Sequence, residues 1–233
     1  MNKAIVLLSG GMDSAVTLFM AMKEYECHAL IFNYGQKALK EVDMAARVSE
    51  KAKVPFTMLN ISMPWEGSAL LDETIAVPEK GASTSGSIPS TYVPARNIIF
   101  LSYGVSYAEA IGAETVFIGA HQMDFSNYPD CRGEFFEAFQ EMVRRGTKQG
   151  VEGNGVKIAT PVLNMAKKDI LSEGLRLGVP FEDTWSCYTG DEDPCGKCES
   201  CHFREEAFAA AGIDDPLISK KSGSAFAKAM ADK

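Results

Sequence analysis

The sequence lacks long hydrophobic runs and an excess of positive charge, and each absence excludes a class of protein. A membrane-spanning helix needs about 18 consecutive apolar residues, whereas the apolar runs here, such as residues 4–8, have the length of a strand. The 233 residues include 23 Lys and Arg against 31 Asp and Glu, a net charge of −8. Because an acidic chain repels nucleic-acid phosphates, we expect neither a membrane protein nor a general nucleic-acid-binding protein.

Low-complexity segments and internal repeats are also missing, and we expect no secretory signal. Forty-six per cent of the residues are hydrophobic and 23% are charged, a balance typical of a folded globular chain. The first three residues lead directly into an apolar run, which is unlike the layout of a signal peptide. We therefore expect a cytoplasmic protein with one main domain.

Short apolar runs rich in β-branched residues alternate with segments of helical period along most of the chain. Expected strands cover residues 4–8, 29–33, 57–61, 115–119 and 157–160. Expected helices cover residues 14–24, 39–53, 97–111, 134–148 and 167–177. Such alternation predicts an α/β protein with a doubly wound parallel sheet, and sheets of this kind bind ligands beyond the carboxyl ends of their strands.

Four of the six cysteines lie close together near the end of the chain, at Cys187, Cys195, Cys198 and Cys201. In a cytosolic protein, clustered cysteines bind metal more often than they form disulfides. Zn²⁺ favours four thiolates in a tetrahedron, and a closed set of four leaves no position for substrate, so we predict one structural zinc per chain. A redox Cys-x-x-Cys pair and an iron–sulfur cluster are the alternative interpretations.

The first expected strand runs into a glycine-containing turn, Ser9-Gly10-Gly11-Met12-Asp13-Ser14, and a helix follows at once. Paired glycines let the backbone turn tightly and present N–H donors, which together with the helix N-terminus form an anion site. Asp13 can cap the helix or help to hold Mg²⁺. The turn lacks both the Gly-Lys-Ser/Thr pattern of a P-loop and the dinucleotide fingerprint. The alternative is a strand-to-helix turn that merely requires glycine.

A polar segment at residues 120–136 follows the fourth expected strand, where a doubly wound sheet places its substrate. Arg132 can hold a carboxylate with two hydrogen bonds, and Asp130 can accept from the amino and ring N–H groups of a guanine-like base. Phe125 and Tyr128 can stack on a flat heterocycle. The alternative is a polar loop that caps the following helix, with Asp130 as the N-cap.

The turn at residues 9–14 resembles the pyrophosphate loop of the N-type ATP pyrophosphatases, a family that adenylates carbonyl or carboxylate groups. This resemblance implies ATP with Mg²⁺ as the nucleotide, and a Rossmann-like fold of the adenine nucleotide alpha hydrolase type. Thr160-Pro161-Val162-Leu163 followed by Lys167 resembles the second phosphate contact of that family, although a lone lysine at a helix start is more often solvated. The resemblance assigns to ATP the residues Leu8, Ser9, Gly10, Gly11, Met12, Asp13, Ser14 and Lys167.

Further motifs resemble the 7-cyano-7-deazaguanine synthase family of the queuosine pathway, and the resemblance covers nearly the whole chain. They are the 9–14 loop, Tyr34-Gly35-Gln36, Tyr92-Val93-Pro94-Ala95-Arg96-Asn97, Asp124-Phe125-Ser126, Tyr128-Pro129-Asp130-Cys131-Arg132 and the four clustered cysteines. That family converts 7-carboxy-7-deazaguanine, ammonia and ATP into a nitrile. The resemblance implies a homodimer, catalytic residues at Asp13, Arg96 and Lys167, and substrate contacts at Phe125, Tyr128, Asp130 and Arg132.

These observations divide the chain into an ATP- and substrate-binding domain at residues 1–180 and a small helical zinc-binding region at residues 181–233. Two other functions remain open. A thiolating enzyme of the same ATP-using group would employ Cys131 as sulfur carrier and tRNA as substrate, which the acidic balance disfavours. A non-enzymatic zinc-binding adaptor would leave the 9–14 loop unexplained.

Overall fold

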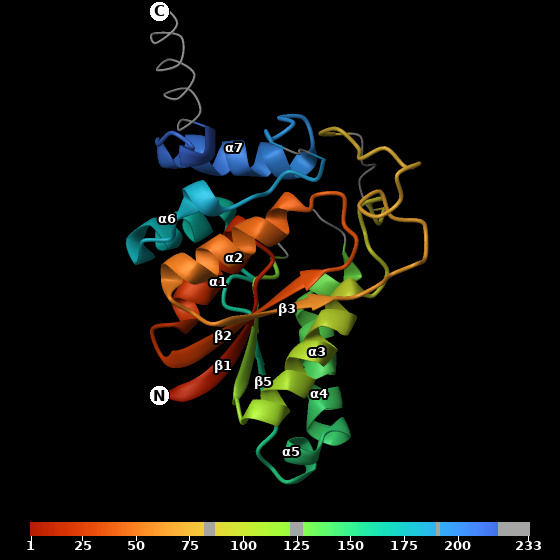
Figure 1. Cartoon of the computed structure of the whole chain (residues 1–233), viewed down its shortest axis with the longest axis vertical. Helices are drawn as coiled ribbons and strands as arrows, with labels where there is room; N and C mark the ends of the chain where they lie inside the picture. The colour runs from red at the N-terminus through yellow and green to blue at the C-terminus, as the bar shows by residue number, and fades with distance from the viewer. Residues whose placement is uncertain (82–86, 122–127, 190–191, 219–233) are drawn as a thin grey trace, which may run out of the picture.

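The computed structural model of the chain describes residues 1–81, 87–121, 128–189 and 192–218. At its centre is a parallel five-stranded sheet of order β3-β2-β1-β4-β5 (Figure 1). The strands are β1 (Asn2–Leu7), β2 (Tyr25–Asn33), β3 (Phe56–Asn60), β4 (Thr115–Ile118) and β5 (Lys157–Ala159). The predicted parallel sheet is confirmed, and the chain crosses from one side of β1 to the other between β3 and β4.

The helices of the described segments match the five expected ones and add two. They are α1 (Met12–Ala21), α2 (Lys40–Ala52), α3 (Arg96–Ile111), α4 (Gly133–Gly146), α5 (Lys148–Val151), α6 (Lys167–Leu177) and α7 (Glu199–Ala211), with 3-10 turns η1 (Pro129–Cys131) and η2 (Phe181–Asp183). The expected helix 134–148 is interrupted because Thr147 has an extended backbone and its hydroxyl caps α5, accepting from the Gly150 N–H at 3.0 Å. Across the described residues, no helix is both long enough and apolar enough to cross a bilayer.

Helices cover both faces of the sheet, and the central strands are therefore buried on both sides. Along β1, Ala4 and Val6 belong to one hydrophobic core, whereas Ile5 and Leu7 belong to the other. The first core includes side chains of α1, α2, α6 and α7, and the second includes side chains of α3 and α4. Figure 1 shows α3 and α4 on the other side of the sheet from α1, α2 and α6. Phe208 of α7 lies in the first core, so the C-terminal helix packs on the same core as the sheet.

Helix α7 lies in the helical region expected at residues 181–233, although the sequence pattern did not give its bounds. Its buried residues are Cys201, Arg204, Ala207 and Phe208, which follow helical spacing. A cysteine and an arginine occupy two of the positions that an amphipathic helix normally gives to larger apolar residues, so the apolar stripe is interrupted.

Arg204 attaches the last described segment to the core. It is 5% exposed, and its guanidinium donates to the two carboxylate oxygens of Asp215 at 2.6 and 2.8 Å. It also donates to the Thr184 hydroxyl at 2.7 Å and to the Phe181 carbonyl at 2.9 Å. Because the buried charge has both an ionic partner and several acceptors, its desolvation is compensated.

Gly174 in α6 marks a close contact within the first core, because a Cβ there would lie 2.4 Å from Cζ of Phe181 and 2.7 Å from Cγ2 of Val16. We predict that Gly174→Ala lowers the free energy of unfolding by about 1–3 kcal/mol, because both neighbours are buried and must move. The matched control is Gly146→Ala at the end of α4, where the nearest contact of a Cβ is Sδ of Met142 at 3.6 Å. Urea unfolding should show a loss of stability for the first variant and not for the control. Equal midpoints would contradict this packing.

Candidate functional site

A pocket opens beyond the carboxyl ends of β1 and β4, where the strand order reverses. This is the position that a doubly wound sheet gives to its ligands. Segments that are far apart in the sequence meet at its wall, which includes Leu8, Ser9, Gly11, Met12, Asp13, Ser14, Tyr34, Glu41, Arg96, His121, Tyr128, Lys167, Trp185, Tyr188 and Glu199.

The two glycines of the 9–14 loop serve different purposes. Gly10 has a φ of 87°, and a Cβ there would lie 2.1 Å from the carbonyl oxygen of Glu41. Gly11 is the N-cap of α1 with an extended backbone, and a Cβ there would make ordinary contacts, the nearest at 3.4 Å. The fold therefore requires glycine at Gly10, whereas glycine at Gly11 keeps the pocket side of the loop open.

Two serine hydroxyls hold the loop in shape. The Ser14 hydroxyl accepts from the Ser9 N–H at 3.2 Å and donates to the Gly11 carbonyl at 3.0 Å. The Ser9 hydroxyl lies 3.0 Å from that of Ser14 and accepts from the Gly11 N–H at 3.3 Å. Hydroxyl and amide donors therefore gather at the N-terminus of α1, where the partial positive charge of the helix favours an anion.

Asp13 and Lys167 form an ion pair on the pocket wall, although 154 positions separate them in the sequence. Nζ of Lys167 lies 2.6 Å from Oδ2 of Asp13, and the two side chains are 21% and 20% exposed. Lys167 is therefore not a solvated lysine. Oδ1 of Asp13 is buried and has no hydrogen-bond partner among the described residues. Since Mg²⁺ takes carboxylate oxygens as ligands, this atom fits a divalent ion that accompanies a polyphosphate.

Arg96 is the first residue of α3 and contributes a cation to the pocket wall. The preceding Ala95 has a left-handed backbone with a φ of 56°, which turns the chain into the helix at this point. Nη1 of Arg96 donates to the hydroxyl of Tyr34 at 3.2 Å. Burial raises the pKa of Tyr34 to about 12, so this partner is a neutral hydroxyl. Arg96 can therefore hold a second anionic group near the 9–14 loop.

The sequence analysis missed Glu41, a carboxyl group in the first turn of α2 that also lines the pocket. Nε2 of Gln36 donates to Oε1 of Glu41 at 3.0 Å, and Oε1 of Gln36 in turn accepts from the Tyr34 N–H at 2.9 Å. Burial raises the pKa of Glu41 to about 7, although Arg96 and the hydrogen bond from Gln36 act in the opposite direction. Its position soon after Tyr34-Gly35-Gln36 was a weak signal, because it does not reveal where the carboxyl group lies.

The expected substrate segment is divided between the pocket and its surroundings. Phe125 lies outside the described residues. Tyr128 lines the pocket, and its hydroxyl lies 2.5 Å from that of Thr91. Asp130 and Arg132 are described by the structure but are not part of the pocket wall.

Each of these two residues has a local role that explains its position. Asp130 is 6% exposed, and its Oδ2 accepts from the Asn97 N–H at 3.1 Å, so it caps the first turn of α3 rather than the helix that follows it. Burial raises the pKa of Asp130 above its ordinary value. Arg132 is the N-cap residue of α4, and its side chain is half exposed. Its Nη1 lies 3.7 Å from Oε1 of Glu134.

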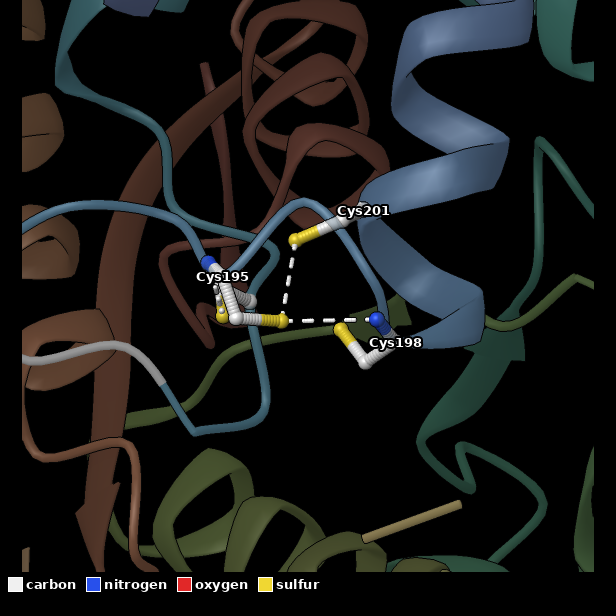
Figure 2. A group of neighbouring side chains, drawn as sticks. Cys195, Cys198 and Cys201 are labelled. Atoms are coloured by element: carbon white, nitrogen blue, oxygen red, sulfur yellow. Dashed lines mark hydrogen bonds between the residues drawn. The ribbon is translucent and has the colours of Figure 1, made fainter. Parts of the chain in front are cut away.

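The four clustered cysteines turn their sulfurs toward one another, and Figure 2 shows three of them. All four Sγ atoms lie within 4.8 Å of one another, and those of Cys195 and Cys201 are 3.9 Å apart. A tetrahedral ion about 2.3 Å from each thiolate places the sulfurs about 3.8 Å apart, so these residues fit one metal ion. Backbone N–H groups of residues 195, 197 and 198 donate to the sulfurs, which stabilises thiolate charge.

Trp185 connects the cysteine cluster to the 9–14 loop. Its indole N–H donates to the Cys187 carbonyl at 3.0 Å, and its backbone N–H donates to the Gly10 carbonyl at 2.8 Å. The side chain is 1% exposed, and Nζ of Lys40 lies 4.4 Å from the centre of its ring. The cysteine-containing region therefore supports the glycine turn directly.

The pKa of Glu41 gives the stability of the fold a dependence on pH with a defined sign. The pKa is raised from 4.5 to about 7, so its stabilising contribution is complete below pH 4.5 and is lost as the pH rises through about 7. We predict that Glu41→Gln removes this loss, raising the free energy of unfolding relative to wild type by about 2–3 kcal/mol more at pH 8 than at pH 5. Urea titrations at both pH values measure the effect, with Glu50→Gln on the exposed side of α2 as the control. Parallel profiles for wild type and Glu41→Gln would contradict the prediction.

Comparison with known proteins places the chain in a family. The family model described as "Queuosine biosynthesis protein QueC" matches residues 3–212. The chain is 48% identical over 221 residues to the 7-cyano-7-deazaguanine synthase of Nostoc punctiforme, covering 93% of this chain and 99% of that protein. It is 47% identical over 220 residues to the protein of the same name from Pseudomonas syringae pv. tomato, covering 92% and 96%.

Among solved structures, NMN synthetase from Francisella tularensis aligns at 17% identity with a TM-score of 0.46, over 91% of this chain and 78% of that one. The family match is far more extensive in sequence. It spans the 9–14 loop, the described pocket wall and the four cysteines. The chain therefore belongs to the QueC family of queuosine biosynthesis proteins.

Proposed function

We propose that this chain catalyses the ATP-dependent conversion of 7-carboxy-7-deazaguanine and ammonia to 7-cyano-7-deazaguanine. The observation that carries the proposal is family membership along almost the whole chain, with relatives near half identity that bear the name 7-cyano-7-deazaguanine synthase. The pocket supports it, because an anion site, an ion pair and a second cation surround one cavity.

The chemistry explains why such a pocket is needed. A carboxylate reacts poorly with ammonia because its leaving group would be oxide. Transfer of AMP to the carboxylate provides a good leaving group, and ammonia then gives an amide. A second activation, on the amide oxygen, permits dehydration to the nitrile. The protein's contribution is mainly to position the reactants and to neutralise their charge.

In this proposal the nucleotide lies over residues 8–14. Its phosphates take over donors that the loop uses within itself, the Gly11 N–H bound to the Ser9 hydroxyl and the Ser14 hydroxyl bound to the Gly11 carbonyl, and the N-terminus of α1 faces the departing pyrophosphate. Asp13 offers its buried Oδ1 to Mg²⁺, which supplies charge neutralisation when bound. Lys167, held beside Asp13, adds a cation for the phosphates.

Arg96 is the side chain that we assign to the substrate carboxylate. It lines the pocket, whereas Arg132 is half exposed beside Glu134. Arg96 donates to the Tyr34 hydroxyl through one nitrogen, and a guanidinium has further donors for a carboxylate. Tyr128 presents an aromatic side chain on the same wall and can stack on the deazaguanine ring.

Residues 1–180 carry the groups that we assign to ATP and substrate, and residues 181–233 contain the zinc site. One structural Zn²⁺ bound by Cys187, Cys195, Cys198 and Cys201 has no open ligand position, so it supports the fold rather than the reaction. We also propose that the protein is a homodimer. Its place is the cytoplasm, where thiols stay reduced.

The described contacts do not favour the thiolating alternative. Cys131 is 9% exposed, and its sulfur accepts from Nδ2 of Asn97 at 3.3 Å. Burial raises the pKa of Cys131 to about 11, so the thiol stays protonated at neutral pH, whereas a sulfur carrier reacts as a thiolate. An adaptor without enzymatic activity would have no use for the partly buried Asp13–Lys167 pair beside an anion site.

Product analysis tests the proposed function. Purified protein supplied with ATP, ammonium and 7-carboxy-7-deazaguanine should release 7-cyano-7-deazaguanine together with AMP and pyrophosphate, because the glycine turn is suited to receive two linked phosphates. Mass spectrometry and nucleotide chromatography identify the products. ADP and orthophosphate as primary products would refute adenylation.

Two glycine variants serve as matched controls for this reaction. Gly11→Val should abolish turnover and lower stability by no more than about 1 kcal/mol, because its side chain occupies the phosphate side of an N-cap position. Gly10→Ala should instead destabilise the fold, since its Cβ would lie 2.1 Å from the Glu41 carbonyl oxygen. The reverse pattern would show that the phosphate face of the loop is misassigned.

The metal content tests the zinc assignment. We predict one zinc per chain by elemental analysis and its loss in Cys201→Ser, because removal of one thiolate opens the four-ligand site. Chelation should lower the midpoint of thermal unfolding, since structural zinc contributes to folding free energy. Cys27→Ser is the control, because Cys27 lies outside the cluster and should leave the zinc content unchanged. Iron in place of zinc would refute the assignment.

A further inference from the structure

The proposed reaction requires a proton acceptor next to the nitrogen that enters the substrate. Ammonia carries three protons, the amide nitrogen two, the activated amide one and the nitrile none. Nitrogen therefore loses one proton in each of three steps. Among the groups described above, the ion pair and Arg96 serve charge neutralisation, and neither accepts protons from nitrogen.

We propose that Glu41 is the catalytic acid–base residue that removes these protons, an inference that rests on the proposed function. Glu41 lines the pocket from the first turn of α2. Its backbone carbonyl lies against Gly10, where a Cβ would approach it to 2.1 Å. The residue is therefore adjacent to the loop at which the phosphates are expected, and it lines the pocket in which a carboxyl group would be activated.

Hydrogen bonds fix the Glu41 carboxyl group on the side of Arg96. Gln36 is 4% exposed and bridges Glu41 Oε1 at 3.0 Å to the Phe32 carbonyl at 3.3 Å, while its own Oε1 accepts from the Tyr34 N–H. The guanidinium of Arg96 is close enough to Glu41 to oppose the rise of its pKa. A substrate carboxylate bound to Arg96 would therefore lie beside Glu41.

The three proton transfers balance as follows. Nitrogen bonds to the activated carboxyl carbon, the bond from carbon to the AMP oxygen breaks, AMP leaves with the electron pair, and Glu41 takes one proton. The amide oxygen then bonds to the α-phosphorus of a second ATP, pyrophosphate leaves, and nitrogen gives up a second proton. Finally the carbon–oxygen bond breaks, AMP leaves, and loss of the last proton completes the nitrile. Solvent water removes the proton from Glu41 between steps.

Other ionisable groups of the pocket are less suited to this role. Asp13 is held by Lys167 at 2.6 Å. Nε2 of His121 donates to the Met165 carbonyl oxygen at 2.5 Å, so only Nδ1 of this ring could accept a proton, whereas the Glu41 carboxylate offers two oxygens, of which Gln36 engages one. Glu199 follows Cys198 directly, so it belongs to the cysteine-containing region rather than to the loop at residues 9–14.

The surroundings of Glu41 set the pH range of the reaction. A pKa of about 7 suits a group that accepts and releases protons near neutrality. Buried Tyr34 and Cys131 titrate near 12 and 11, well above this range. The charged or titratable groups on the elements packed around α2 are Arg96 of α3, Tyr34 after β2, Asp13 of α1 with its partner Lys167, and Asp183 of η2 with its partner Lys51 at the other end of α2.

The experiment separates adenylation from the steps that use nitrogen. Exchange of labelled pyrophosphate into ATP, with 7-carboxy-7-deazaguanine and without ammonium, reports adenylation alone, and nitrile formation reports the whole sequence. In Glu41→Gln, whose side-chain oxygen can still accept from Gln36, exchange should stay within about twofold of wild type. Nitrile formation should fall about a hundredfold or more, and its rise with pH through about 7 should disappear. The matched control is Glu50→Gln on the exposed side of α2, which should behave as wild type in both assays.

The outcomes separate failure of the role assigned to Glu41 from failure of the proposed nitrile-forming function. Absence of exchange and of nitrile in wild type would refute the proposed function. If wild type shows both, then nitrile formation by Glu41→Gln at the wild-type rate overturns the role of Glu41, and so does equal loss of exchange and nitrile formation. If Glu41→Gln does not fold, Glu41→Asp takes its place: its shorter carboxyl group should slow nitrile formation about tenfold or more while leaving exchange near wild type, and a wild-type rate of nitrile formation would overturn the inference. Selective loss of nitrile formation with an altered pH profile supports the inference, and an unchanged profile overturns it.

Discussion

The close approach of Gly10 to α2 is the constraint on which the pocket depends. No side-chain carbon fits between them, because a Cβ would lie 2.1 Å from the Glu41 carbonyl oxygen. This contact sets the loop at the start of α1 against the first turn of α2, and so places the Glu41 carboxyl group beside the anion site. It also presents the Gly10 carbonyl to the Trp185 N–H at 2.8 Å. One backbone contact therefore aligns three separate segments.

Much of the fold was predictable because its signals are local. A strand such as β1 is a short apolar run, and its residues reach both cores in alternation, so composition alone marks it. The loop at residues 9–14 and the four clustered cysteines were likewise recognisable from the order and spacing of their residues alone. Asp130 shows where this stops: its carboxylate binds the N–H of Asn97, 33 positions earlier, and no local pattern reveals that partner. Glu41 was missed for the same reason. Helix α2 contains several carboxyl groups, and the sequence does not tell which of them lines the pocket.

The C-terminal part of the chain has a larger role in the pocket than its short cysteine motif indicates. Trp185, Tyr188 and Glu199 all contribute to the wall, so the pocket draws on both sides of residue 180. Phe208 packs into the core shared with β1, and Arg204 binds the turn at η2 through the Phe181 carbonyl. The cysteine cluster therefore stands next to a wall of the pocket that it helps to hold in place.

The environment of Trp185 has an optical consequence. Tryptophan emission responds to nearby charge and to the hydrogen bond of the indole N–H, and this indole has both, from Lys40 at 4.4 Å and from the Cys187 carbonyl at 3.0 Å. The second tryptophan of the chain, Trp65, is 43% exposed. The two residues therefore emit from different surroundings: Trp185 is buried beside a positive charge, and Trp65 is exposed to solvent. Trp185 is thus an intrinsic fluorophore that contacts both the cysteine cluster, through Cys187, and the 9–14 loop, through Gly10.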